Sequence, residues 1–194
     1  MAKPGQITPN RRRVFRFDTQ TAEIRRIQYR GKRCIIRGLH FKKAALSDFY
    51  RHSIFHALFP QYSLKPLGVS SIRSAGGITK FGMVSEILKK RSPDYKKYQY
   101  WIYELRIEKK PQEILRHERF VKEIAEPIAF HIEQTSGIVL NDHPVNVANI
   151  QGMPVFFEID YIAKKQFYNY LKNVASDAIE KSKMKMLHKW IARL

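Results

Sequence analysis

The sequence predicts an α+β fold, with an antiparallel sheet and one helix followed by a mainly helical part, arranged as one domain of good size or as two small lobes. Short apolar segments separated by turn signals fill residues 14–88, and apolar residues recur at helical spacing through most of residues 98–194. The chain has 194 residues and is 44% hydrophobic, which is enough for a core. We therefore expect a basic N-terminal arm (1–13), an N-lobe (14–88), a linker (89–97) and a C-lobe (98–194).

The first lobe is predicted to have the order β-β-α-β-β. Two apolar segments flank a glycine turn at Gly31, which is typical of a hairpin. The helix that follows has apolar residues at helical spacing and ends at Pro60. The predicted elements are strands at residues 24–29 and 34–37, a helix at 41–59, and strands at 64–72 and 78–88.

The second lobe is predicted to begin with a long amphipathic helix. Apolar residues recur at helical spacing from Pro111 to Ile132, and Gly137 ends the helix, with a kink expected at Pro127. An apolar segment at residues 138–140 is a short strand or a turn. After it we expect one buried strand at residues 153–162 and a final helix within residues 164–194.

The formal net charge of +19, from 36 basic and 17 acidic residues, indicates an anionic partner. A phosphorylated substrate, nucleic acid and an anionic membrane surface all remain open, as does the oligomeric state. Aromatic residues and lysines at 96–103 fit either a stacking platform for single-stranded nucleic acid or core packing. The lysines of residues 164–189 fit either a solvated helix face or an anion-binding surface.

The single cysteine, Cys34, excludes an internal disulfide framework and a paired-cysteine metal site. We expect it to be a small core residue in a reducing compartment. No apolar run approaches the ~18 residues of a membrane span, and the N-terminus lacks the apolar section of a secretory signal. A cytoplasmic protein is therefore expected.

Residues 136–162 carry the side chains best suited to chemistry. The helix ends at Gly137, Asp142 follows in a loop, Asn146 comes shortly after it, and Asp160 ends a predicted strand. Asp142 has an alternative role as the cap of a local turn. Asp160 has an alternative role in a salt bridge, since an acid at a buried strand end needs a partner.

This order resembles the C-lobe of the protein-kinase-like superfamily, in which a helix, a loop with Asp before Asn, and a hairpin lead to a metal-binding Asp. The resemblance implies ATP and Mg²⁺ as cofactors, with Asp142 as the catalytic base and Asn146 and Asp160 as metal ligands. Asn149 is an alternative to Asn146. Glu158 is a nearby rival to Asp160, although alternation along one strand would leave both side chains on one face, so that both could take part.

The order of the first lobe also resembles a kinase N-lobe. Arg37 falls where the family has its phosphate-pairing lysine, although a lone arginine in a strand is more commonly just an exposed strand residue. Residues 18–22 stand where the family has a glycine-rich loop, and they contain no glycine. The resemblance implies either a divergent kinase that transfers phosphate from ATP to an anionic or phosphorylated substrate, or a pseudokinase binding module. A hypothesis of another class is a non-catalytic, basic nucleic-acid-binding protein.

Overall fold

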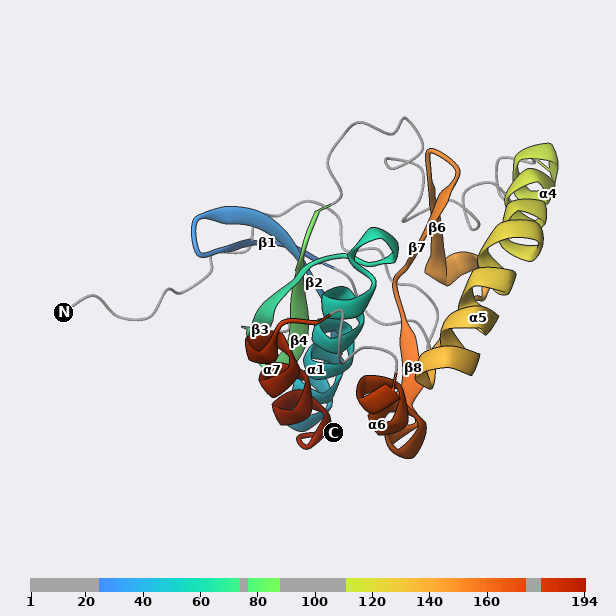
Figure 1. Cartoon of the computed structure of the whole chain (residues 1–194). Helices are drawn as coiled ribbons and strands as arrows, with labels where there is room; N and C mark the ends of the chain where they lie inside the picture. The colour runs from blue at the N-terminus through green and yellow to red at the C-terminus, as the bar shows by residue number, and fades with distance from the viewer. Residues whose placement is uncertain (1–24, 74–76, 88–110, 174–178) are drawn as a thin grey trace. The chain divides into compact units, whose positions relative to one another are not determined.

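The computed structural model describes residues 25–73, 77–87, 111–173 and 179–194 (Figure 1). The expected basic arm, the linker and the aromatic segment at 96–103 lie outside the described residues. Within the described part, the fold is α+β, with an antiparallel sheet and several helices, as the sequence predicts. No described helix has the length and apolar character needed to cross a membrane.

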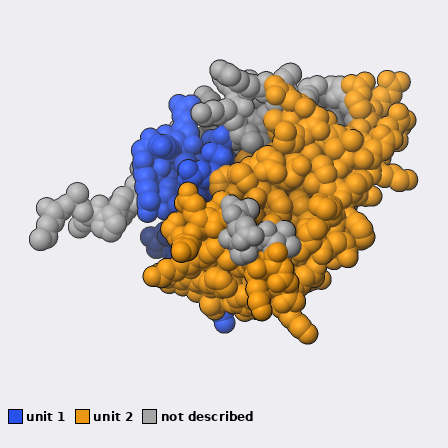
Figure 2. Space-filling view, in the orientation of Figure 1, with its two compact units in different colours: residues 1–50, 65–87 blue, residues 51–64, 88–194 orange. Residues whose placement is uncertain are grey.

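The chain forms two compact units (Figure 2). Unit 1 comprises Met1–Tyr50 and Lys65–Ile87, and unit 2 comprises Arg51–Leu64 and Leu88–Leu194.

Unit 1 contains a four-stranded antiparallel sheet in the order β1-β2-β4-β3. Arg30 and Gly31 form the two-residue turn between β1 and β2, and both have positive φ, 49° and 75°. A turn of this kind matches the right-handed twist of the two strands that it joins. The pairing of β1 with β2 confirms the predicted hairpin, and the pairing of β3 with β4 confirms the two later strands. Cys34 is a core residue, 1% exposed, and burial raises the pKa of its thiol. The strands are β1 (Arg25–Tyr29), β2 (Lys32–His40), β3 (Pro66–Arg73) and β4 (Thr79–Glu86).

Helix α1 (Lys42–Leu58) confirms the helix predicted between the two strand pairs. Its second half lies in unit 2, where Ile54 and Phe55 are fully buried. Phe55 meets Phe156 edge to face, with ring centroids 6.4 Å apart. A short 3-10 helix, η1 (Pro60–Tyr62), follows and ends the helical segment at the predicted proline.

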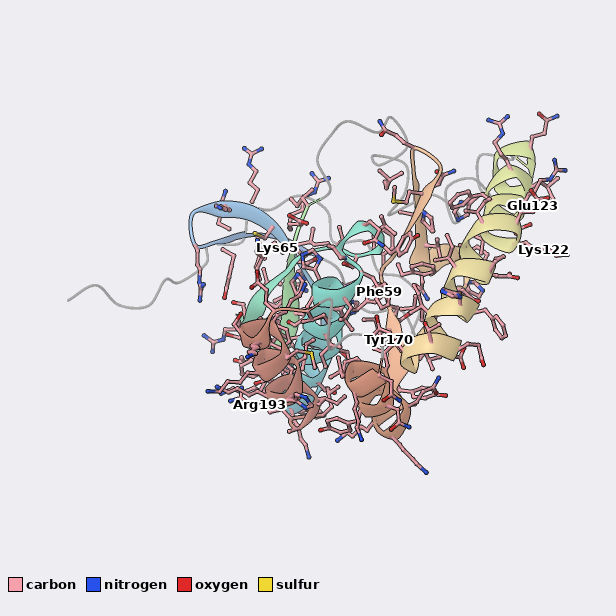
Figure 3. The ribbon with its side chains drawn as sticks, in the orientation of Figure 1. Phe59, Lys65, Lys122, Glu123, Tyr170 and Arg193 are labelled. Carbon is pink, nitrogen blue, oxygen red and sulfur yellow. The ribbon has the colours of Figure 1, made fainter. Side chains whose placement is uncertain are left out.

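The predicted long helix of unit 2 is confirmed as α4 (Pro111–Phe120) and α5 (Glu126–Ser136), joined by a π-helical turn, η2 (Val121–Ala125) (Figure 1). Pro127, in the first turn of α5, cannot donate a helical hydrogen bond, and the irregular turn immediately precedes it. Val121 and Ala125 face the core, and the labelled Lys122 and Glu123 project outward (Figure 3).

Gly137 ends α5 in the left-handed conformation, φ 71°, and its N–H donates to the Glu133 carbonyl at 2.8 Å. A Cβ at this position would lie 2.9 Å from Cβ of Gln166, so the close approach also requires glycine. Gln166 Nε2 in turn donates to the carbonyls of Glu133 and Gln134, both at 2.8 Å. The end of α5 is therefore capped from a helix that follows much later in the chain.

The expectation of one buried strand at 153–162 is wrong. Two strands occupy this segment, and β7 pairs with β6 whereas β8 pairs with β5. The sequence of this segment does not reveal that its pairing partner changes midway, because strand pairing depends on residues distant along the chain. The elements are β5 (Ile138–Leu140), the 3-10 helix η3 (Pro144–Asn146), β6 (Val147–Ile150), β7 (Met153–Phe156) and β8 (Ile159–Ile162).

The C-terminal segment contains two described helices, α6 (Lys164–Asn173) and α7 (Lys181–Ile191), where one helical segment was expected. Phe167 and Leu171 of α6, with Leu187 and Ile191 of α7, are fully buried. They join one core cluster with residues of α1, α5, β5, β7 and β8. This core fixes the strands that carry the candidate site.

Candidate functional site

The loop that carries Asp142 and Asn146 is tied at both ends to the segment between β7 and β8. At its start, the Asn141 N–H donates to the Glu158 carbonyl at 3.1 Å, which extends the β5–β8 ladder. At its end, the Phe157 N–H donates to the Asn146 carbonyl at 2.8 Å. The chain from residue 157 to 160 therefore runs along both ends of the loop, and brings Asp160 beside it.

Asp160 is the extra residue of a β-bulge in β8. Val139 pairs with Tyr161 and Leu140 pairs with Ile159, so Asp160 has no opposite residue on β5. The bulge breaks the alternation of the strand, and Asp160 and Tyr161 are both exposed. The expectation that Asp160 occupies a buried strand end is therefore wrong. Its carboxylate is instead open to a ligand.

Asn141 joins the loop to the bulge. Its Nδ2 donates to Asp160 Oδ1 at 3.1 Å, and its Oδ1 accepts from the His143 N–H at 3.2 Å. The second bond is the side-chain turn that the sequence suggested for Asp142. Because Asn141 makes this turn, the half-buried Asp142 does not have to serve as its cap.

Arg51 holds the backbone of the bulge from α1. Its Nη1 donates to the Ile159 carbonyl at 3.0 Å and also to the Asp160 carbonyl. These charge-assisted bonds fix the main chain at the residue where the strand is irregular. They also put a permanent positive charge near the carboxylate of Asp160.

His117 anchors the middle of the loop to α4. The imidazole is 3% exposed, and its Nε2 lies 2.8 Å from the Pro144 carbonyl oxygen, to which it donates. Its ring stacks on Phe120, with centroids 6.1 Å apart. Burial lowers the pKa of His117, and the hydrogen bond to Pro144 partly opposes this shift. The neutral ring therefore serves as a fixed donor beneath the loop.

Asn149 and Glu158 are the alternatives to Asn146 and Asp160 that the sequence suggests, and the structure describes the surroundings of both. Asn149 Oδ1 accepts from the Gly152 N–H at 2.8 Å, within the hairpin turn between β6 and β7. That bond occupies an amide oxygen that a metal would need, which favours Asn146. Glu158 lies next to the bulge, which breaks the alternation at Asp160, so the same-face argument for the pair does not apply.

Arg37 lies in β2 of unit 1, opposite Met83, immediately before a register shift in the pairing of β2 with β4. It is half-buried rather than fully exposed. Asp142, Asn146 and Asp160 belong to unit 2. Within unit 2, Asp160 lies beside Asn141 at the start of the loop and Asn146 lies beside Phe157 at its end. A shared metal site of Asp142, Asn146 and Asp160 stays a prediction, as does the phosphate contact of Arg37.

A magnesium ion fits the chemistry of these side chains. The described residues contain no group of three or more His, Cys, Asp or Glu arranged to enclose a metal. Mg²⁺ in nucleotide sites, however, is commonly bound by one or two protein oxygens together with substrate phosphates and water. The exposed carboxylate of Asp160 and the amide oxygen of Asn146 are ligands of that kind.

Sequence reasoning missed Asn141, Arg51 and His117. Only Asn141 had a signal, as an asparagine directly before a loop aspartate. The chain matches no family model, no curated protein and no solved structure. Function is therefore inferred from the residues and their geometry.

Proposed function

We propose that this chain is a divergent protein-kinase-like protein that binds Mg²⁺·ATP and transfers its γ-phosphoryl group to an anionic or phosphorylated substrate. The observation that carries the proposal is the bulge at Asp160. It presents a carboxylate held by Asn141 directly beside the loop of Asp142 and Asn146.

The order of elements in unit 2 supports the proposal. Helix α5 leads into β5, then the loop, then the β6–β7 hairpin, and finally Asp160. The protein-kinase-like superfamily has its catalytic loop, hairpin and metal-binding aspartate in this order. The loop and the β6–β7 hairpin both lie between β5 and β8 in the sequence. Because β8 pairs with β5, the chain returns after the hairpin to the start of the loop, where Asn141 contacts Asp160.

The proposed chemistry assigns one task to each side chain. Asn141 fixes Asp160 Oδ1, and the carboxylate of Asp160 with the amide oxygen of Asn146 would hold the metal. The Mg²⁺ ion, when bound, neutralises charge on the phosphates of the nucleotide. Asp142 accepts the proton of the substrate hydroxyl. As it does so, the hydroxyl oxygen of the substrate bonds to the γ-phosphorus, and the bond between that phosphorus and the leaving oxygen of ADP breaks.

The positive charge of the chain supports an anionic substrate. The formal net charge of +19 raises the local concentration of polyanions near the surface. Arg37 is proposed to contact the phosphates of the nucleotide, in place of the lysine of the family. A pseudokinase is the non-catalytic form of the same proposal, in which the nucleotide binds and no transfer follows.

A thermal shift assay with Mg²⁺·ATP tests the proposal. Ligand at about 100 times its Kd stabilises a protein by about 2.7 kcal/mol. For a chain of this size, that raises Tm by about 5 to 10 °C. The shift should vanish in Asp160→Ala and persist in Glu158→Gln, which changes an exposed carboxylate nearby. A wild-type melting curve that Mg²⁺·ATP leaves unchanged would sink the proposal.

Asp142→Asn separates the kinase from the pseudokinase. The variant should keep the Mg²⁺·ATP shift, because Asp142 binds neither the metal nor the nucleotide in this scheme. Release of labelled γ-phosphate by the wild type, and its loss in Asp142→Asn, would establish catalysis. A wild type that binds Mg²⁺·ATP and releases no labelled phosphate would give the result expected of the pseudokinase form.

A further inference from the structure

The exposed faces of α6 and α7 carry rows of cations. Side chains four residues apart are neighbours on a helix surface, and α7 repeats a cation at that spacing along its whole length. On α6 the same spacing places Tyr168 between two lysines. We define the α6–α7 cation face as the following exposed residues: Lys164, Lys165, Tyr168 and Lys172 of α6, and Lys181, Lys185, His188, Lys189 and Arg193 of α7 and its C-terminal end.

The charge distribution on this face opposes helix stability. Neither α6 nor α7 contains an acidic residue, and lysines occupy the first turn of each. The helix dipole favours acidic side chains at that end, and like charges one turn apart repel. Glu180 at the N-cap of α7 and the cations in the last turns suit the dipole, but they do not remove the repulsion along the rows. Local rules broken in this way are found at functional surfaces.

A ring stack joins the two rows into one surface. Tyr168 of α6 and His188 of α7 have ring centroids 5.6 Å apart and planes inclined by 20°. Tyr168 is 38% exposed and thus presents an aromatic ring among lysines. By contrast, Tyr170 packs against the core, and burial raises its pKa (Figure 3).

The apolar side of α7 is buried in the protein core. Leu187 and Ile191 are fully buried in the core of unit 2. A helix that inserts into a lipid surface needs its apolar side for the acyl chains. The α6–α7 cation face therefore suits a partner that offers phosphates to the lysines and flat rings to Tyr168.

We propose that the α6–α7 cation face binds single-stranded nucleic acid, with lysines along the phosphate backbone and bases stacked at the Tyr168–His188 pair. This proposal does not rest on the proposed kinase-like function, because no residue of the face belongs to the site around Asp160.

Salt dependence tests the backbone contacts. The probe is a fluorescein-labelled oligouridylate of about 20 nucleotides, titrated by fluorescence anisotropy over a series of salt concentrations. Each neutralised phosphate of a single strand contributes about 0.7 to the slope of log K against log salt. The double variant Lys185→Gln/Lys189→Gln should reduce that slope by about 1.4. The matched control, Lys42→Gln/Lys43→Gln, removes the same charge from two exposed lysines of unit 1 and should leave the slope unchanged.

Base stacking is tested at Tyr168. Tyr168→Ala should weaken binding by about tenfold, whereas Tyr168→Phe keeps the ring and should bind as the wild type does. Phosphatidylserine vesicles should not displace the oligonucleotide. The proposal is overturned if both lysine pairs change the slope equally, if the α7 pair does not change it, or if the vesicles bind and the oligonucleotide does not.

Discussion

Replacement of His117 by leucine should loosen the loop that carries Asp142 and Asn146. Leucine fills much of the imidazole volume but cannot donate to the Pro144 carbonyl, which the wild-type Nε2 reaches at 2.8 Å. Loss of a buried donor costs about 1 to 3 kcal/mol, and the stack with Phe120 is lost as well. We expect a decrease of about 2 kcal/mol in the free energy of unfolding. For this chain length it corresponds to a fall in Tm of about 4 to 8 °C.

The effect should depend on pH in a definite direction. Burial lowers the pKa of His117 in the folded protein, so between that pKa and the unfolded value of about 6.5 the unfolded chain binds more protons. His117 therefore destabilises the wild type progressively as pH falls below about 6.5, and imposes no such penalty above it. The stability difference between the wild type and His117→Leu should be largest at neutral pH and shrink on acidification.

Urea denaturation followed by circular dichroism, at neutral and at acidic pH, measures this difference. His131→Leu is the control, because His131 is exposed on α5 and should change stability little at either pH. A His117→Leu protein as stable as the control would refute the anchoring role. So would a difference from the wild type that does not vary with pH.

Three further changes have expected outcomes. Gly137→Ala should lower stability by about 2 kcal/mol in denaturant titrations, because φ is 71° and the new Cβ meets Gln166 at 2.9 Å; an unchanged midpoint would contradict this. Asn141→Ala should weaken Mg²⁺·ATP binding in calorimetry by less than Asp160→Ala does, since it frees the metal ligand without removing it. Lys185→Glu should raise the free energy of unfolding by about 1 kcal/mol, because it turns two like-charge pairs of α7 into opposite-charge pairs, and a lower Tm would argue against repulsion there.

The parts of the fold that local signals specify were predicted correctly. The glycine turn at Gly31, the helix ending before Pro60 and the long helix ending at Gly137 all follow from residues close in sequence. The division of residues 153–162 into β7 and β8 did not follow, because it depends on which strand each half pairs with. Pairing partners are set by tertiary packing, which the sequence of one segment does not encode.

For the candidate site, the sequence suggested Asp142, Asn146 and Asp160 but none of the side chains that hold the loop and the bulge in place. The bulge at Asp160 depends on the register with β5, so the sequence suggested burial where the side chain is exposed. Arg51 donates to a carbonyl 108 residues later, and His117 to one 27 residues later. A lone arginine and a lone histidine on helices give no sign of such partners before the chain is folded.

Isothermal titration of ATP, in the presence of Mg²⁺ and then of a chelator, would decide whether Asp160 holds a nucleotide-bound metal. We predict that ATP binds the wild type with Mg²⁺, that affinity drops when the metal is removed, and that Asp160→Asn binds weakly in both conditions while Glu158→Gln behaves as the wild type. Equal affinity with and without Mg²⁺, or an unaffected Asp160→Asn, would contradict the assignment of the site.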